Sequence, residues 1–262
     1  VPQGRDLDLS GGAPRGGTAM RNRTAAAIII GNEILSGKVA DANAAFLARE
    51  LRPIGVSLER IVVVPDDLDV IGDTVREHAA RFDVVFTSGG VGPTHDDITM
   101  AGIARGLGRP VVRHPVLVEK MRAFARGELT PPKLKMTEVP EGAEPIFDGA
   151  IPFPVVRVDN IYILPGIPEL FREKFLAIRS RFAVDPFFMR VVYTRAPETA
   201  IAAFLDSTLA AFPALLLGSY PKLGDPEYQV RVTLESKDES YVNRALDHLV
   251  ACLPPESIVR TE

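Results

Sequence analysis

Short, wholly apolar runs alternate in the first part of the chain with segments whose apolar residues recur every three or four positions. The run at 25–30 ends at Gly31 and is typical of a strand buried on both faces. The segment after it carries an apolar stripe, and Asp41 stands where a helix cap is expected. The same alternation predicts strands at 25–30, 56–64 and 83–87, and helices at 41–50, 67–81 and 96–106. Such βαβ units predict an α/β fold with a mainly parallel sheet and helices on both of its faces.

The pattern is weaker beyond Pro110 and changes character near Asp185 and Pro186. Between Pro110 and Asp185 the pattern predicts a helix at 114–126, a long surface loop at 128–144, a hairpin at 154–158 and 160–164, and a helix at 169–181. The last stretch predicts strands at 189–193, 215–220 and 228–235 with helices at 198–212 and 240–253. This βαββα order indicates a small α+β C-terminal subdomain. We therefore expect a glycine-rich leader at 1–23, a main domain at 24–185 and the subdomain at 186–262.

Composition and charge narrow the classes of function. The chain has 262 residues and a net charge of −4, which disfavours broad binding to a nucleic-acid backbone. No apolar run has the roughly 20 residues of a membrane span, so we expect neither a nucleic-acid nor a membrane partner, and a cytoplasmic protein. The single cysteine, Cys252, rules out a disulfide framework or a multi-cysteine zinc site. The four histidines lack metal-ligand spacing, so any metal must be held by carboxylates.

The strongest local feature is the segment 88–99, which reads SGGVGPTHDDIT. It follows a predicted central strand and precedes a predicted helix, which is where ligands bind in open α/β sheets. Ser88, Gly89, Gly90 and Gly92 permit close approach of the backbone to a ligand and present N–H groups to an anion. The alternative is a plain strand-to-helix connection with one aspartate as the helix cap. One cap needs only one carboxylate, which leaves the second of the Asp96–Asp97 pair free for a cation or a water.

Two further polar clusters follow the other predicted strands. Asp66 and Asp67 come after the second strand, and Gly31, Asn32 and Glu33 come after the first. Each cluster alone is an ordinary cap or turn. Together they place carboxylates and glycines at one sheet edge, as expected for a magnesium-type site that acts on a phosphate ester.

Other charged residues attract weaker interpretations. His95 lies inside the glycine segment, where it is a secondary candidate for ligand contact. Lys133, Lys135 and Arg157 are interpreted as solvated surface rather than as phosphate ligands.

Several motifs together resemble the MoaB/Mog molybdopterin-binding family. The doubled aspartate resembles the branch that contains the competence/damage-inducible protein A family, and the N-terminal domain of eukaryotic FAD synthase is the nearest likeness. The resemblance rests on 88–99 and on Gly31 to Gly37, Asp41-x-Asn43, Val64 to Asp67, Leu164 to Leu170, Leu217 to Pro221 and Tyr228 to Val230. It implies a three-layer α/β/α domain with the ligand at the glycine segment. It also favours a homo-oligomer.

The resemblance implies two kinds of reaction. Molybdenum-cofactor members bind and adenylylate molybdopterin, whereas the competence-protein and FAD-synthase branches resemble metal-dependent pyrophosphatases that release AMP. We favour hydrolysis of FAD or ADP-ribose with Mg, Mn or Co, in which Asp66, Asp96 and Asp97 hold the metal or orient water. The implied substrate contacts are Gly31, Glu33, Ser88, Gly89, Gly90, Gly92, Thr94, Pro165 and Gly166. The alternatives are molybdopterin adenylylation and a binding module without turnover.

One residue departs from the family pattern. The competence-protein branch has Gly-Asp-Glu where this chain has Gly31-Asn32-Glu33. If that aspartate is a metal ligand, Asn32 removes one charge from the site while its carbonyl oxygen still coordinates.

Overall fold

A six-stranded sheet forms the centre of the main unit in a computed structural model that describes residues 22–125, 128–148 and 153–262. Its strand order is β2-β1-β3-β8-β7-β6, and the first four strands run parallel. The strands are β1 (Arg23–Ile30), β2 (Val56–Val64), β3 (Val84–Ser88), β6 (Glu144–Ile146), β7 (Val155–Val158) and β8 (Ile161–Leu164). β7 and β8 form the predicted antiparallel hairpin. The predicted leader at 1–23 lies outside the described residues except for its last two, and β1 begins at Arg23.

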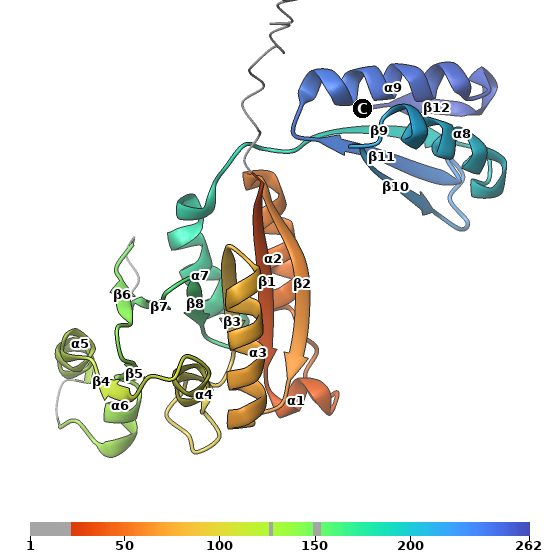
Figure 1. Cartoon of the computed structure of the whole chain (residues 1–262). Helices are drawn as coiled ribbons and strands as arrows, with labels where there is room; N and C mark the ends of the chain where they lie inside the picture. The colour runs from red at the N-terminus through yellow and green to blue at the C-terminus, as the bar shows by residue number, and fades with distance from the viewer. Residues whose placement is uncertain (1–21, 126–127, 149–152) are drawn as a thin grey trace, which may run out of the picture.

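Helices cover both faces of this sheet, as Figure 1 shows, and the predicted three-layer architecture is confirmed. One face packs against α2 (Asn43–Leu51) and α7 (Pro168–Ile178), with Phe46 and Phe175 in edge-to-face contact at 5.9 Å. The other face packs against α3 (Leu68–Arg81) and α4 (Thr99–Gly106) through Ile71 and Ile103, both fully buried. Successive residues of β1 alternate between the two cores, because side chains along a strand point to opposite faces. The unit also contains the short helix α1 (Asn32–Leu35) and the 3-10 turns Arg52–Ile54 and Arg179–Phe182.

Two predictions for the main unit are wrong. The helix predicted at 96–106 begins at Thr99, because Asp96 and Asp97 use their carboxylates within the preceding turn and not as helix caps. The surface loop predicted at 128–144 contains α6 (Pro131–Lys135) and β5 (Glu138–Pro140). β5 pairs antiparallel with β4 (Val111–Arg113), and α5 (Pro115–Ala125) lies between the two strands along the chain. Strands of three residues, such as β4 and β5, are too short to produce a visible hydrophobic period.

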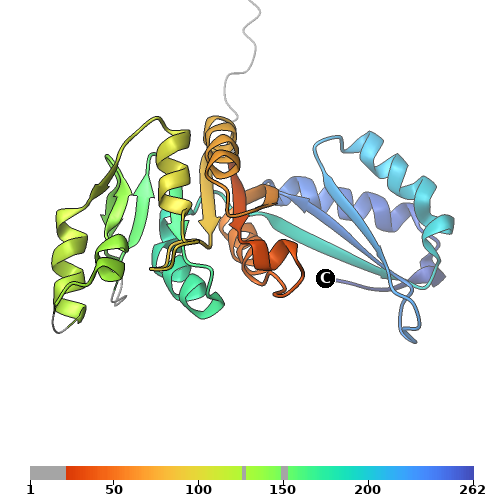
Figure 2. The ribbon, with the colours of Figure 1, turned by 90° about the horizontal axis from the view of Figure 1, so that it is seen from below.

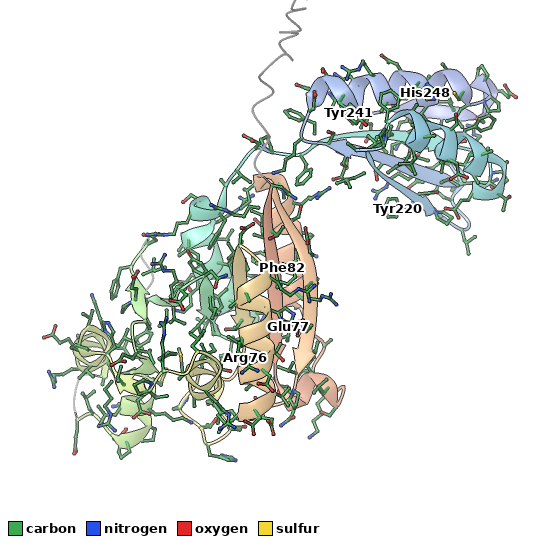
Figure 3. All side chains as sticks on the ribbon, in the orientation of Figure 1. Arg76, Glu77, Phe82, Tyr220, Tyr241 and His248 are labelled. Atoms are coloured by element: carbon green, nitrogen blue, oxygen red, sulfur yellow. The ribbon has the colours of Figure 1, made fainter. Side chains whose placement is uncertain are left out.

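The C-terminal residues form a second, separate sheet with the order β10-β11-β9-β12 and antiparallel pairing throughout. Its elements are β9 (Phe188–Thr194), α8 (Glu198–Ala211), β10 (Leu216–Pro221), β11 (Val230–Ser236), α9 (Glu239–Cys252), a 3-10 turn at Pro255–Ser257 and β12 (Ile258–Thr261). Tyr241 and His248 of α9, labelled in Figure 3, both pack edge-on against Phe212. The predicted α+β subdomain is therefore present, with one additional short strand, β12.

The C-terminal unit is joined to the main unit near the start of β2. Arg52 pairs with Glu235 of β11 and lies 3.5 Å from the ring centroid of Phe187, and the ammonium of Lys237 donates to the carbonyl of Gly55 at 2.8 Å. Gly55 immediately precedes β2, so these contacts lie at the amino end of that strand. Figure 1 shows the carboxyl ends of β1 and β2 at the opposite end of the sheet.

None of the helices in the described part of the chain has both the length and the apolar character needed to span a membrane.

Burial of one lysine predicts a dependence of stability on pH. Lys174 of α7 donates hydrogen bonds to the carbonyls of Phe153 and Pro154. Burial lowers the pKa of Lys174 to about 8, although the negative charge of Glu173 acts to raise it. The unfolded chain holds this proton until a pH of about 10.4, so it binds more protons than the folded chain in the interval between the two values. The free energy of unfolding should therefore rise from pH 8 to pH 10. Urea unfolding at pH 7, 8.5 and 9.5 measures this rise, and the rise should be smaller in Lys174→Met. If the free energy of unfolding increases with pH equally in both proteins, the prediction is contradicted.

Candidate functional site

The carboxyl ends of β2 and β1 are joined by hydrogen bonds. The N–H of Gly31 donates to the carbonyl of Val64 at 3.1 Å, and the N–H of Asn32 donates to Asp66 Oδ2 at 2.8 Å. Asp67 caps α3, where its Oδ1 accepts from the N–H groups of Asp69 and Val70. The two neighbouring aspartates therefore have different structural roles. Asp67 caps α3, and Asp66 holds the start of α1 through a hydrogen bond.

The end of β3 is joined to the end of β8 through a buried asparagine. The side-chain amide of Asn43 donates to Ser88 Oγ at 2.9 Å and to the carbonyl of Gly166 at 2.8 Å, and Ser88 Oγ lies 3.4 Å from the carbonyl of Pro165. Asn43 is only 4% exposed, and its Oδ1 has no partner among the described residues. The predicted substrate contacts did not include Asn43. The signal for it was the Asp41-x-Asn43 motif, whose aspartate accepts from the N–H of Asn43 at 3.0 Å and so orients the start of α2.

The glycine segment begins at the end of β3, where the backbone of Gly89 lies close to the end of β1. Gly89 has a φ of 105°, and a Cβ at this position would lie 2.1 Å from the carbonyl oxygen of Ile30. Thr99 holds the segment from its other end through two hydrogen bonds. Its Oγ1 donates to the carbonyl of Gly89 at 2.8 Å, and its N–H donates to the carbonyl of Gly90 at 3.0 Å. Only glycine satisfies both the conformation and the close contact at position 89.

Three consecutive backbone N–H groups of this segment are free to bind an anion. Within the described ranges, no acceptor is present for the N–H groups of Gly90, Val91 and Gly92. Gly90 has a φ of 62°, in the left-handed region. A left-handed residue beside consecutive N–H groups forms the concave cradle that binds phosphates in many proteins.

Two carboxylates share one hydroxyl group beside this cradle. Thr94 Oγ1 lies 2.5 Å from Asp96 Oδ1 and 2.5 Å from Asp97 Oδ2, and the N–H of Thr94 donates to the same Asp97 oxygen at 2.7 Å. One hydroxyl donates only one hydrogen bond at a time, so the second carboxylate oxygen faces the hydroxyl oxygen without a proton between them. The Thr94 hydroxyl, the backbone of Asp96 and the nearby charges of His95 and Lys135 hold the pKa of Asp96 below its usual value. The Asp96 carboxylate therefore carries a charge at neutral pH that attracts a cation.

The structure places the other predicted residues around the same edge of the sheet. The carboxylate of Glu33 lies over Gly31, where a Cβ would be only 2.5 Å from Oε1. Gly166 approaches Gly89 so closely that a Cβ would lie 3.2 Å from the Gly89 Cα. The backbone at the ends of β2, β1, β3 and β8 is thus brought together. Figure 2 views the molecule toward this edge.

The predicted metal ligands do not form one compact group. Asp96 and Asp97 both contact Thr94, whereas Asp66 lies between β2 and α3 and its carboxylate contacts the start of α1. In the described part of the chain, no group of three or more histidine, cysteine, aspartate or glutamate side chains is arranged to hold a metal ion. Two carboxylates and a hydroxyl are still suitable oxygen donors for Mg²⁺, which usually keeps several of its water ligands.

One residue interpreted as solvated surface lies at the site. The ammonium of Lys135, at the end of α6, donates to the backbone carbonyl of Thr94. Lys133 of the same helix donates to the carbonyl of Glu128 and remains outside the glycine segment. The His95 side chain is 96% exposed, with Nδ1 3.9 Å from Asp96 Oδ1.

Two cavities lie away from the glycine segment. One of about 340 Å³ is lined by Arg23, Asp83, Arg157 and Tyr162 at the opposite edge of the sheet. The other, of about 430 Å³, is lined by Arg52 and by Leu217, Tyr220 and Thr233 of the C-terminal unit. The motif at 217–221 therefore belongs to β10, and Figure 3 shows Tyr220 far from the lower end of the main sheet.

Comparisons with known proteins agree with this architecture. Residues 26–182 match the family described as a probable molybdopterin binding domain, and residues 186–262 match the middle domain of FAD synthase. A protein of Archaeoglobus fulgidus is 33% identical over 219 residues, which cover 84% of this chain and 93% of that protein. A probable FAD synthase of Caenorhabditis elegans is 31% identical over 257 residues, and the match covers 87% of this chain but only 50% of that protein.

A crystal structure of the protein CinA from Thermoplasma acidophilum, described as having unknown function, is 33% identical. It aligns with a TM-score of 0.56 and covers 61% of this chain and 98% of its own. The matched residues include the glycine segment and all four strand ends around it. The chain therefore belongs to the MoaB/Mog-like molybdopterin-binding domain family, with a C-terminal unit of the FAD synthase middle-domain type.

Proposed function

We propose that the chain is a divalent-metal-dependent pyrophosphatase that cleaves an adenosine pyrophosphate, FAD or ADP-ribose, to AMP and a second phosphate ester. The observation that carries the proposal is the contact of two carboxylates, Asp96 and Asp97, with the single hydroxyl of Thr94. The free N–H groups of Gly90, Val91 and Gly92 lie in the same short segment. The N–H groups can donate hydrogen bonds to the oxygens of a pyrophosphate. Because the carboxylates repel that anion, a divalent cation must lie between them and the phosphates.

The residues of the chain have separate roles in this reaction. The N–H cradle binds the oxygens of the pyrophosphate and stabilises the charge that grows on them in the transition state. Asp97 orients the attacking water, and Asp66 supports the site from the end of β2 through its hydrogen bond with the N–H of Asn32. The oxygen of that water bonds to the phosphorus of the AMP half, its proton passes to a carboxylate or to solvent, and the bridging oxygen leaves with the other phosphate. A divalent cation held by Asp96, Asp97 and Thr94 would neutralise charge and act as a Lewis acid.

The likeness to FAD synthases supports an adenosine compound as the ligand, although the chain spans only about half the length of those relatives. The test is to incubate the protein with Mg²⁺, Mn²⁺ or Co²⁺ and with FAD or ADP-ribose, and to quantify AMP. Release of AMP that EDTA abolishes is the expected result. Absence of AMP with every metal and both substrates would overturn the proposal.

A second candidate function is ligand binding without turnover. The separation of Asp66 from the Asp96–Asp97 pair favours it, because no third carboxylate among the described residues completes a metal site. Tight binding of FAD, ADP-ribose or a pterin without AMP release would identify this function.

A further inference from the structure

Lys135 is held at the glycine segment by tertiary packing. Val139 of β5 and Ile103 of α4 belong to the same buried core, which fixes the arm formed by β4, β5, α5 and α6 against the helix that follows the segment. Thr137, fully buried, closes the end of α6: its Oγ1 donates to the carbonyl of Leu134 at 2.7 Å, and its own carbonyl accepts from the N–H of His114 at 2.9 Å. The half-buried Lys135 side chain therefore starts from a fixed backbone and ends on the carbonyl of Thr94.

The Lys135 ammonium contacts the residue on which two carboxylates converge, so its charge partly offsets theirs where a phosphate would approach. The Lys135 ammonium contacts the Thr94 carbonyl, and its charge helps to lower the pKa of Asp96. Its contact with Thr94 is to a neutral carbonyl, which is a weaker acceptor than a phosphate oxygen. A lysine side chain has a flexible stem, so the ammonium can exchange one acceptor for the other without movement of the backbone.

We infer that Lys135 binds the phosphate oxygens of the substrate and selects ligands that carry a pyrophosphate over uncharged nucleosides. This inference rests on the proposed function, because it gives the pyrophosphate of that substrate a specific partner. The cradle N–H groups hold one side of the anion and Lys135 the other. Lys135 also offsets the two carboxylates that would otherwise repel the incoming phosphates.

The test compares two lysines of the same five-residue helix. The variants are Lys135→Met, Lys135→Arg and the control Lys133→Met, whose lysine donates to Glu128 and does not contact the segment. Titration calorimetry with Mg²⁺ measures the Kd of adenosine and of an ADP-ribose analogue in which a methylene bridge prevents cleavage. Loss of a charge-assisted hydrogen bond predicts a Kd for the analogue about 10- to 100-fold higher in Lys135→Met. The Kd for adenosine should be the same in every variant as in the parent protein. The Kd for the analogue should be unchanged in Lys133→Met and should stay within a few-fold of the parent value in Lys135→Arg.

Other outcomes separate the inference from the proposed function. Unchanged affinity of Lys135→Met for the analogue, or an equal loss for adenosine, would show that Lys135 does not recognise phosphate. Binding of the analogue by the parent protein without AMP release from FAD or ADP-ribose would remove the hydrolase function and leave the role of Lys135 to be decided by the same titrations. If the parent protein does not bind the analogue, both the function and the inference fail.

Discussion

Asp97→Asn is expected to lower AMP release from FAD and ADP-ribose by at least about 100-fold, which is typical when a charged metal ligand or water-orienting group is lost. The amide oxygen of asparagine can still accept the hydrogen bond that the N–H of Thr94 donates to Asp97 Oδ2 at 2.7 Å. The turn should therefore persist while the pair with Asp96 loses half of its charge. A coupled AMP assay and a thermal melting curve measure the two properties separately.

Asp67→Asn is the matched control for this change. Asp67 caps α3 through two backbone N–H groups, and asparagine caps helices about as well as aspartate. Its activity and melting temperature should stay close to those of the parent protein. Asp66→Asn, one residue earlier, should lose activity because the Asp66 carboxylate lies at the carboxyl end of β2, where it accepts from the N–H of Asn32. If Asp97→Asn releases AMP as fast as the parent protein, the carboxylate pair has no part in hydrolysis and the site only binds its ligand.

Gly89→Ala is expected to lower the free energy of unfolding by about 2 to 5 kcal/mol, through backbone strain together with overpacking. The φ of Gly89 is 105°, and the added Cβ would lie 2.1 Å from the carbonyl oxygen of Ile30. That oxygen belongs to the backbone of β1 and cannot rotate away as a side chain can. The change should also weaken binding of the pyrophosphate analogue, because it displaces the segment that carries the free N–H groups.

Gly108→Ala separates the two causes. Gly108 has a φ of 63°, but a Cβ there would meet nothing within 4 Å, so only conformational strain of about 1 to 2 kcal/mol remains. Urea unfolding of both variants gives the difference that belongs to the contact with β1. Equal destabilisation by the two substitutions would contradict the importance of the close approach at Gly89.

Much of the site's scaffold could be predicted from local sequence. Strands buried on both faces, such as 25–30, are recognisable because every residue must be apolar, and the glycines at their ends follow from the turns required there. The parallel order then placed the segments after β1, β2 and β3 at one edge of the sheet, which the structure confirms, and the structure adds the end of β8 to them. The different roles assigned to Asp66 and Asp67 do not follow from local sequence alone, because a cap and a ligand have the same local sequence; the structure confirms Asp67 as the cap.

Two features of the site depended on contacts that local patterns do not encode. Asp96 and Asp97 look like the start of a helix, but the fold of the glycine segment directs both carboxylates to Thr94 and delays α4 until Thr99. Lys135 resembles any surface lysine, and its neighbour Lys133 has the same surroundings in sequence. Buried strands and glycine turns depend on residues that are adjacent in the sequence. The sequence by itself therefore determined the α/β scaffold and the place of the site. The partner of Lys135 lies 41 residues away, and only the packing of β5 against α4 decided that this lysine reaches the glycine segment.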